Sequence, residues 1–487
     1  MKKQTYEFWF LVGSQHLYGP EAIRQVNEDA AIICQSLTGP EFPYPIEYKG
    51  VVQETSEITA MIREANFSDK CAGIITWMHT FSPSKMWIPG LSILNKPYLH
   101  LHTQFNRNIP YQTIDMDYMN LHQSAHGDRE HSFAAARLGM ARKIVVGFWQ
   151  DNEVRRQIGE WTQVAAGAML SKALKIIRFG DNMREVAVTE GDKIEALIKL
   201  GWTVDYYGVG DLVRVVDAVS EAEIDLLVAE YISQYKINTD DLTSIRYQAR
   251  LEAGIGRFLE ERGASGFTTN FEDLQGLAQL PGLAVQRLMA KGYGFGGEGD
   301  WKTAALVALV KAMGGSQTSF MEDYTYDLEA GQERVMGAHM LEVCPSIAGG
   351  QPSVEVHDLG IGGKDAPARL VFEARAGRAV CATLIDIGGR MRLIVNEIEV
   401  MKNNPQMPKL PVARAIWQPL PNFHDGVMGW LLAGGGHHSV LTYTFSAENF
   451  QDWAGIMGIE CVLIGEKTSL DSFKQSLFLA DLVWKLK

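Results

Sequence analysis

Four residues in glycine-rich or aromatic surroundings have side chains that could hold a divalent metal ion. Glu298 lies in GYGFGGEGDW, Glu322 in SFMEDYTYD, His339 in GAHMLEVCPS and His438 in LAGGGHHSV. Two carboxylates and two imidazoles form a mixed oxygen and nitrogen ligand set that suits an ion such as Mn²⁺. The same carboxylates could move a proton on a substrate held by that ion. This chemistry indicates an enzyme, provided that the fold brings the four segments together.

The glycine loop around Glu298 could instead bind a nucleotide or serve a purely structural purpose. Three of its glycines fit the dinucleotide fingerprint GxGxxG: Gly292, Gly294 and Gly297. That fingerprint follows a strand, whereas a helical pattern precedes this loop, so we reject a nucleotide site. We expect a close-packed loop that ends at Asp300, a good N-cap for a helix over Trp301–Met313. Taken alone, Glu298 could be a solvated loop residue and Glu322 part of a charged surface turn.

The histidine segments could be structural as well. We expect a strand through His339, and side-chain alternation would place His339 and Glu342 on opposite faces. A helix would instead pair them at i, i+3, and a histidine in such a strand is usually a core residue. Three glycines precede His437 and His438, and they could mark a bend or a close approach to a ligand. Adjacent side chains of an extended chain point in opposite directions, so we expect at most one of these two histidines to be a direct ligand.

Two other histidine pairs could serve a different chemistry. His100 and His102 share one face of an expected strand, as in the HxH metal pair of many hydrolases. His122 and His126 have i, i+4 spacing, but no glutamate follows the first, so the HExxH motif is absent. His126 precedes Gly127 and looks like a residue of a site loop. A metal-dependent hydrolase therefore stays open as an alternative.

The elements that must position these residues begin with a regular alternation of strands and helices. Near-continuous apolar strands separated by helices predict a doubly wound parallel sheet covered on both faces. Gln15 follows the first strand, where open α/β sheets place ligand contacts. The strand candidates are Glu7–Gly13, Ala72–Trp77, Tyr98–Thr103 and Lys143–Trp149, and the helical patterns include Ala22–Leu37 and Ser56–Ala65.

A second α/β cycle and a β-rich region follow. The cycle contains strands at Lys175–Phe179 and Thr203–Val209, and helical patterns at Lys193–Leu200, Ser220–Arg262 and Gly282–Lys291. The last third has β-rich segments at Leu370–Ala374, Ala379–Ile385 and Arg390–Glu399, which predict an antiparallel sheet or barrel. We therefore expect an α/β fold with an N-terminal domain over 1–170, a central domain over 171–320 and a β-rich C-terminal domain over 321–487.

Composition excludes several classes of protein. At 487 residues the chain is long enough for about three domains. A formal net charge of −13, without a basic stripe, excludes a sequence-independent nucleic-acid binder. No segment approaches the ~18 uninterrupted apolar residues of a membrane helix, and the apolar run near the amino terminus is too short for a signal peptide. Five scattered cysteines indicate reduced thiols rather than a disulfide framework. We expect a cytoplasmic protein that binds neither nucleic acid nor membrane.

Together, the segments resemble the L-arabinose isomerase family. The resemblance rests on GYGFGGEGDWKTAAL, TSFMEDYTY, GAHMLEVCPS, LGIGGKDAPARL and AGGGHHSV in that order, and on FWFLVGSQHLYG and MNLHQSAHGDRE nearer the amino terminus. It extends over essentially the whole chain. The chain departs from the family pattern at two places. His131-Ser132 stands where the family tends to have an aromatic residue and glycine, and Gly296 stands where the family often has alanine.

The resemblance implies a fold similar to L-fucose isomerase and a homo-oligomer, typically a hexamer, with sites near subunit boundaries. It implies conversion of the aldose L-arabinose to L-ribulose in arabinose catabolism, with D-galactose to D-tagatose as a side reaction. Our hypothesis for the mechanism is a cis-enediol intermediate. Another aldose isomerase, such as L-fucose isomerase, is the nearest alternative.

The resemblance also implies roles for individual residues. Glu298, Glu322, His339 and His438 would hold Mn²⁺, with Co²⁺ or Mg²⁺ as alternatives. Our hypothesis adds that Glu298 and Glu322 also carry the proton, as catalytic residues. The implied substrate contacts are Gln15, Gln123, His126, Met183, Phe271 and Ile361, and the first three of these could be contributed by two different subunits.

Overall fold

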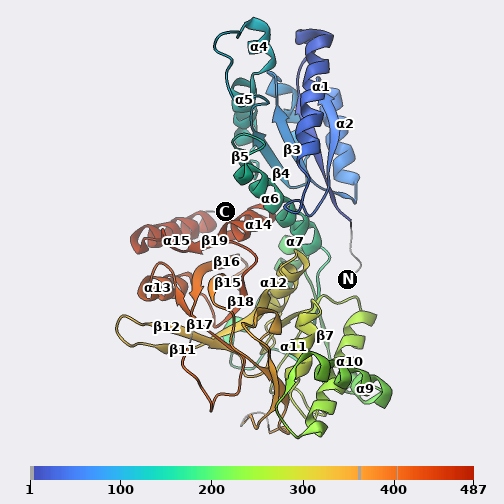
Figure 1. Ribbon diagram of the computed structural model, residues 1–487, viewed down its shortest axis with the longest axis vertical. Coiled ribbons are helices and arrows are strands. Elements are labelled where there is room, and N and C mark those ends of the chain that lie inside the picture. Colours follow the sequence, from blue (N-terminus) through green and yellow to red (C-terminus); the bar gives the residue numbers. More distant parts are fainter. Residues whose placement is uncertain (1–4, 360–362, 403, 487) are drawn as a thin grey trace. The chain divides into compact units, whose positions relative to one another are not determined.

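The computed structural model (Figure 1) describes residues 5–359, 363–402 and 404–486. Ile361, an expected substrate contact, lies outside these ranges. The chain forms two compact units, one spanning Lys2–Met169 and the other Leu170–Lys487. The division of the second unit into a central and a C-terminal domain stays a prediction.

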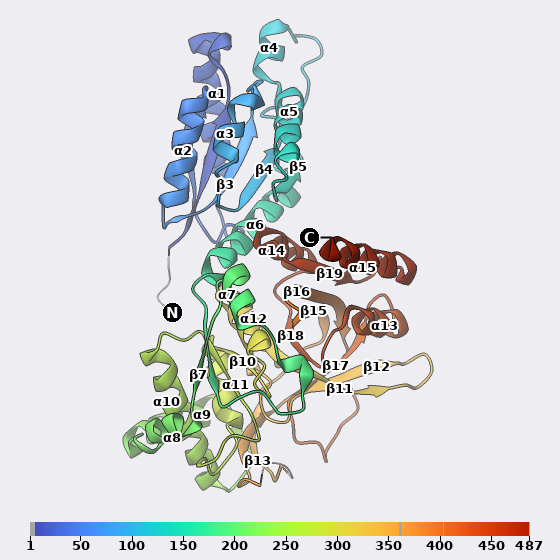
Figure 2. The same ribbon diagram turned by 180° about the vertical axis from the view of Figure 1, so that it is seen from behind.

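The N-terminal unit is built on a parallel sheet in the order β2-β1-β3-β4-β5. Its strand β3 is buried along its whole length, as an apolar strand covered on both faces should be. Figure 2 shows the helices that flank this sheet. The strands are β1 (Glu7–Gly13), β2 (Ile46–Val52), β3 (Cys71–Met78), β4 (Tyr98–His102) and β5 (Lys143–Val146); the helices are α1 (Gly19–Ser36), α2 (Thr55–Phe67), α3 (Ile88–Leu91), α4 (Met116–Leu121), α5 (Ser124–Arg137) and α6 (Asn152–Ser171).

The second unit opens with another parallel sheet, in the order β10-β9-β6-β7. The two parallel sheets confirm the predicted α/β class. The strands are β6 (Lys175–Phe179), β7 (Thr203–Tyr207), β9 (Gly266–Thr269) and β10 (Gly294–Gly296); the helices are α7 (Lys193–Leu200), α8 (Val209–Asp217), α9 (Glu221–Gln234), α10 (Leu242–Glu261), α11 (Gly282–Ala290) and α12 (Trp301–Ala312).

The helical region expected over Ser220–Arg262 is two helices rather than one. Between α9 and α10 the chain forms the short strand β8 (Lys236–Ile237). This strand pairs with β13 (Ser353–Val356), which pairs in turn with β14 (Ala368–Val371). A partner more than a hundred residues away therefore interrupts the helix, and no local pattern could show it.

The last third forms a closed antiparallel barrel, which confirms the second of the two predicted β-rich arrangements. The strands follow one another in the order β15-β18-β11-β12-β17-β16, and β16 pairs back with β15 to close the ring. They are β11 (Thr318–Asp327), β12 (Arg334–Ala338), β15 (Gly377–Asp386), β16 (Met391–Val400), β17 (Arg414–Pro419) and β18 (His438–Thr442); β19 (Glu460–Ile464) adds to β16, and helices α13 (Phe423–Ala433), α14 (Ala447–Met457) and α15 (Leu470–Lys485) complete the unit.

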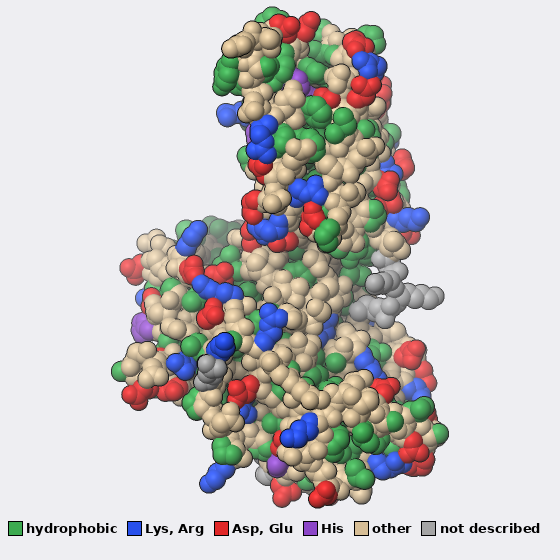
Figure 3. Space-filling model, in the orientation of Figure 1, with side chains coloured by type: hydrophobic (Ala, Val, Ile, Leu, Met, Phe, Trp, Pro, Cys, Tyr) green, Lys and Arg blue, Asp and Glu red, His purple; other side chains and the backbone are tan. Residues whose placement is uncertain are grey.

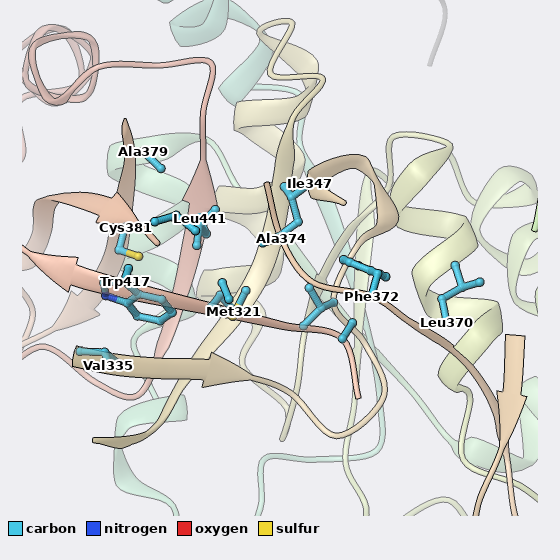
Figure 4. Close-up of a cluster of buried hydrophobic side chains, with 14 of the residues drawn as sticks. Met321, Val335, Ile347, Leu370, Phe372, Ala374, Ala379, Cys381, Trp417 and Leu441 are labelled. Carbon is cyan, nitrogen blue, oxygen red and sulfur yellow. The ribbon is translucent and has the colours of Figure 1, made fainter. Parts of the chain in front are cut away.

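Apolar side chains fill the barrel, as Figure 4 shows for Met321, Cys381, Trp417 and Leu441. Gly337 makes room for the largest of them. A Cβ atom at this position would lie 2.1 Å from a carbon of the Trp417 ring, far inside contact distance. The packed interior gives the strands a fixed register, and this register positions the candidate site.

Surface charges of both signs are interspersed on the face shown in Figure 3, without a basic stripe. All five cysteines are free, as expected, and four are buried. Within the described ranges, no helix is both long and apolar enough to cross a membrane.

Candidate metal centre and active site

Strand pairing in the barrel brings three of the four expected ligands together. On β11, Glu322 lies opposite His438 of β18 on one side and opposite Ala338 of β12 on the other. His339 directly follows Ala338, so it emerges beside Glu322 at the end of β12. The register thus joins segments that are separated by 17 to 116 positions in the chain.

Helix α12 delivers the fourth residue, Glu298. This helix is buried on all sides over its first ten residues, because it packs against the parallel sheet on one side and barrel strands β11, β15 and β18 on the other. Asp300 caps it, accepting hydrogen bonds from the amides of Lys302 and Thr303, as predicted. The loop before the cap therefore lies beside the ends of the barrel strands next to which the histidines are placed.

The backbone at Glu298 is in a left-handed conformation, with φ of 58°, which is rare for a residue other than glycine. Such a conformation costs on the order of 1–3 kcal/mol and persists only where the surroundings impose it. The next amide, at Gly299, donates to the Thr269 carbonyl at 3.0 Å, and the Glu298 carbonyl accepts from the Met183 amide at 3.1 Å. These bonds hold the strained residue with its carboxylate toward the histidines.

The four side chains converge. The Glu298 Oε2 atom lies 3.9 Å from His438 Nε2, and the Glu322 Oε2 atom lies 4.0 Å from His339 Nε2. The two histidine rings are 5.9 Å apart between centroids. His437 joins the group, with its Nε2 atom 3.2 Å from Glu298 Oε2. Glu298, His437 and His438 each offer a ligand atom within 4.8 Å of the others.

Carboxylates behind the two histidines leave their Nε2 atoms available. His438 Nδ1 lies 3.1 Å from Asp300 Oδ2, and His339 Nδ1 is hydrogen-bonded to Glu342. Among the described residues, the buried Nε2 atom of His438 has no hydrogen-bond partner. An imidazole that donates from Nδ1 to a carboxylate and keeps Nε2 free is the usual arrangement of a metal-binding histidine. The residues present therefore fit a divalent cation.

Charges in the site favour a cation as well. Burial by itself would lower the pKa of His339, but the carboxylates of Glu342, Glu322 and Glu298 together outweigh it and raise the pKa to about 9. Burial by itself would raise the pKa of Glu298, but the hydrogen bond with His437 and the neighbouring imidazoles lower it. The buried carboxylate of Asp300, beside the Lys302 ammonium, also has a lowered pKa. The carboxylates of Glu298 and Asp300 therefore stay ionised and attract positive charge.

Two of the expected substrate contacts border this group. Met183 is tied to Glu298 through the backbone hydrogen bond, and the Phe271 ring stacks on His339 at 5.9 Å with an interplanar angle of 14°. Both side chains are partly exposed. They lie where the wall of a small-molecule site would be.

The remaining expected contacts form a second group, within the N-terminal unit. The Gln123 Oε1 atom lies 3.1 Å from His126 Nδ1, and the Gln123 side-chain amide donates to the Tyr18 hydroxyl at 3.0 Å. The Tyr18 amide donates to the carbonyl of Gln15. These residues follow β1 or begin α5. Tyr18, which was not predicted, could have been found because it lies in the same GSQHLYG motif.

The histidine pair that suggested a hydrolase has another role. His100 and His102 share a face of β4, as expected, but both rings bond to the buried Asp128, each at 2.8 Å. Asp128 also accepts from the amide of Met78. The pair therefore anchors helix α5 to the sheet, and the described contacts do not favour the hydrolase.

One local expectation was wrong. His339 lies in a turn after β12 rather than in a strand, so it meets Glu342 at i, i+3. His437 precedes β18, and both His437 and His438 approach Glu298; that at most one of them is a direct ligand stays a prediction. Helix α11 precedes the glycine loop, as expected, and the loop itself contains the short strand β10.

Known proteins resemble this chain over nearly its whole length, including all four candidate ligands. Family models for the N-terminal, central and C-terminal domains of L-arabinose isomerase match residues 2–173, 175–316 and 317–460. L-arabinose isomerase 1 of Bacillus licheniformis is 54% identical over 100% of this chain and 99% of that protein. The L-arabinose isomerases of Geobacillus stearothermophilus and Thermotoga maritima are 56% and 55% identical, each over 99% of both chains. The chain belongs to the L-arabinose isomerase family.

Proposed function

We propose that this chain is a Mn²⁺-dependent aldose–ketose isomerase that converts L-arabinose to L-ribulose. Membership of an isomerase family supports the reaction class, and the names of the relatives support the substrate. The observation that carries the metal proposal is the convergence of two carboxylates on two histidines whose Nε2 atoms are left available.

Glu298, Glu322, His339 and His438 would hold the ion, with Co²⁺ or Mg²⁺ as alternatives. Bound there, it would supply Lewis-acid stabilisation of negative charge on the substrate oxygens. Oxygen and imidazole nitrogen together suit Mn²⁺. His437 lies close enough to Glu298 to orient its carboxylate by a hydrogen bond.

The two glutamates would carry the proton. One carboxylate would take the proton from C2 of the open-chain aldose as a C1–C2 double bond forms, and the carbonyl oxygen on C1 would take up a proton from water to give a cis-enediol. The carboxyl group that holds the C2 proton would then give it to C1, while the hydroxyl on C2 returns its proton to water and becomes the ketone. No electrons are gained or lost overall. General base catalysis of this kind contributes roughly 10²–10⁴ in rate.

Gln15, Gln123 and His126 would bind the sugar hydroxyls from a second subunit of a homohexamer, with Met183 and Phe271 forming the wall beside the metal. This proposal rests on the clustering of the first three in the N-terminal unit, each with a polar group near the ends of the strands. D-galactose, which has the same stereochemistry near the reacting carbons, would be a slower substrate and yield D-tagatose. We also propose a cytoplasmic location.

Ketose formation from a panel of aldoses tests the function. Protein stripped of metal with a chelator should be inactive, and Mn²⁺ should restore conversion of L-arabinose to L-ribulose. Glu298→Gln and Glu322→Gln should each lower kcat by at least about 10², whereas Glu329→Gln on the exposed hairpin loop serves as the control. Absence of L-ribulose from the Mn²⁺ sample would overturn the proposal.

Substrate carrying deuterium at C2 tests the enediol. Transfer by a carboxylate allows exchange, so part of the label should appear in water. Complete retention of deuterium in the ketose would support a hydride shift instead and exclude the enediol route.

A further inference from the structure

The segment that carries Met183, a residue of the proposed substrate wall, also connects the glutamate loop of the metal centre with its histidine segment. Residues 182–190 run beside the Glu298 loop, where the Asn182 side chain donates to the Gly299 carbonyl at 3.2 Å and the Met183 amide donates to Glu298. At its other end, Val188 packs against Gly436, so closely that a Cβ atom there would lie 2.5 Å from a Val188 methyl. Gly436 directly precedes the two histidines. The segment therefore touches both the glutamate loop and the histidine segment.

The buried ammonium group of Lys302 binds this segment through hydrogen bonds. Lys302, in the first turn of α12, is 1% exposed. Its Nζ atom donates to the carbonyls of Val188, Thr189 and Glu190 at 3.0, 2.9 and 2.6 Å. An ammonium group has three donors, and all three are used. Burying a charge is costly unless it is paired and hydrogen-bonded, so the arrangement is specific.

The same ammonium group lies 3.4 Å from Asp300 Oδ1. The other oxygen of Asp300 accepts from the Thr303 hydroxyl at 2.7 Å and lies 3.1 Å from His438 Nδ1. Lys302 thus contacts the carboxylate that orients His438 and the segment that contacts Glu298. A lysine in the first turn of a helix would otherwise be expected in solvent.

We propose that Lys302 is a positioning residue for the metal centre, which holds residues 182–190 and Asp300 in the arrangement that aims Glu298 and His438 at one ion. The inference rests on the proposed metal dependence. Since coupling between two sites is reciprocal, the contacts of Lys302 should strengthen Mn²⁺ binding, and bound Mn²⁺ should stabilise residues 182–190.

Mn²⁺ titration of the metal-stripped full chain by calorimetry tests this. Lys302→Met keeps the length of the side chain and removes the charge and donors. We expect its Kd for Mn²⁺ to rise about 10–100-fold, the usual effect of losing a residue that supports a metal ligand. Lys311→Met, on the same helix but beside Cys344, should stay within about twofold of wild type. A Kd for Lys302→Met equal to that of wild type, in a folded protein, would overturn the inference and leave the proposed function intact.

Hydrogen exchange on the unaltered protein covers the case in which Lys302→Met fails to fold. Saturating Mn²⁺ should slow exchange of the amides in 183–190 by about fivefold or more, which corresponds to roughly 1 kcal/mol. If the exchange rates in this segment are unchanged with Mn²⁺ bound, Lys302 does not couple residues 182–190 to the metal centre and the inference is refuted. If the wild-type chain binds no Mn²⁺ at all, the proposed metal dependence fails first, and this inference fails with it.

Discussion

Replacing Gly297 by alanine should weaken metal binding through a single methyl group. A Cβ atom at this position would lie 2.8 Å from His339 Nε2, the atom that faces Glu322, and 3.1 Å from the adjacent ring carbon. Gly297 does not have a left-handed φ, so alanine brings no backbone strain of its own. The effect of the substitution is therefore confined to the space in front of the imidazole.

The structure sets the size of the effect. Ordinary contact begins near 3.4 Å, so the ring must withdraw by about 0.6 Å. It cannot rotate freely, because Nδ1 is bonded to Glu342 and the ring packs against Phe271 and Phe320. Metal–ligand distances tolerate only about 0.2 Å. We expect the Kd for Mn²⁺ to rise at least about tenfold, or about 1.4 kcal/mol, with a loss of kcat/KM that approaches 10².

Calorimetry with Mn²⁺ and a ketose assay at saturating Mn²⁺ measure these effects. Gly210→Ala in α8 is the matched control, because no atom would lie within 4 Å of its Cβ and its φ is also not left-handed. Melting of the metal-free proteins shows whether either variant is destabilised. If Gly297→Ala binds Mn²⁺ within twofold of wild type, His339 Nε2 does not face the ion and the proposed ligand set is wrong.

Three further predictions concern residues around and away from the centre. Glu342→Gln removes the charge that supports His339 and should weaken Mn²⁺ binding about tenfold by calorimetry; an unchanged Kd would mean that the contact is only structural. Gly296→Ala introduces the residue that is frequent in the family at this position. It should lower the free energy of unfolding by about 1–3 kcal/mol, because its Cβ would lie 2.3 Å from the Asp300 carbonyl oxygen and 2.9 Å from the Ala304 nitrogen. An unaltered melting temperature would contradict this prediction. Burial, followed by the charges of His100 and Arg142, holds the pKa of His131 well below its usual value, so the folded chain keeps it neutral while the unfolded chain binds a proton below pH ~6.5. This contribution to stability is therefore present above pH ~6.5 and falls by up to about 1.4 kcal/mol per unit as the pH decreases; urea midpoints at pH 7 and pH 5 should move less in His131→Phe, and equal shifts in both proteins would refute it.

The sequence by itself determined the elements that depend on short windows. The predicted bounds are confirmed for strands Glu7–Gly13 and Lys175–Phe179 and for helix Lys193–Leu200. Short runs rich in apolar residues mark the two buried strands, and the 3.6-residue period marks the helix. The cap at Asp300 was equally predictable, since an aspartate directly before a helical run satisfies its free amides. Strand β2 was missed because only Val52 among its residues is buried and its apolar pattern is weak.

The candidate residues could also be identified from their motifs, but the sequence could not show that they lie close together in space. Glu322 faces His438 only because β11 and β18 pair in one register, and a shift by one residue would turn Glu322 to the other face. The contact between His339 and Glu342 depends on a turn where the local pattern indicated a strand. The sequence around Lys302 does not show that its ammonium group is buried, because the three carbonyls that it contacts belong to residues 188–190, more than a hundred positions away. Propensity and periodicity are local properties, whereas register, barrel closure and the burial of a charge arise from packing between distant segments. Only the tertiary structure decides these.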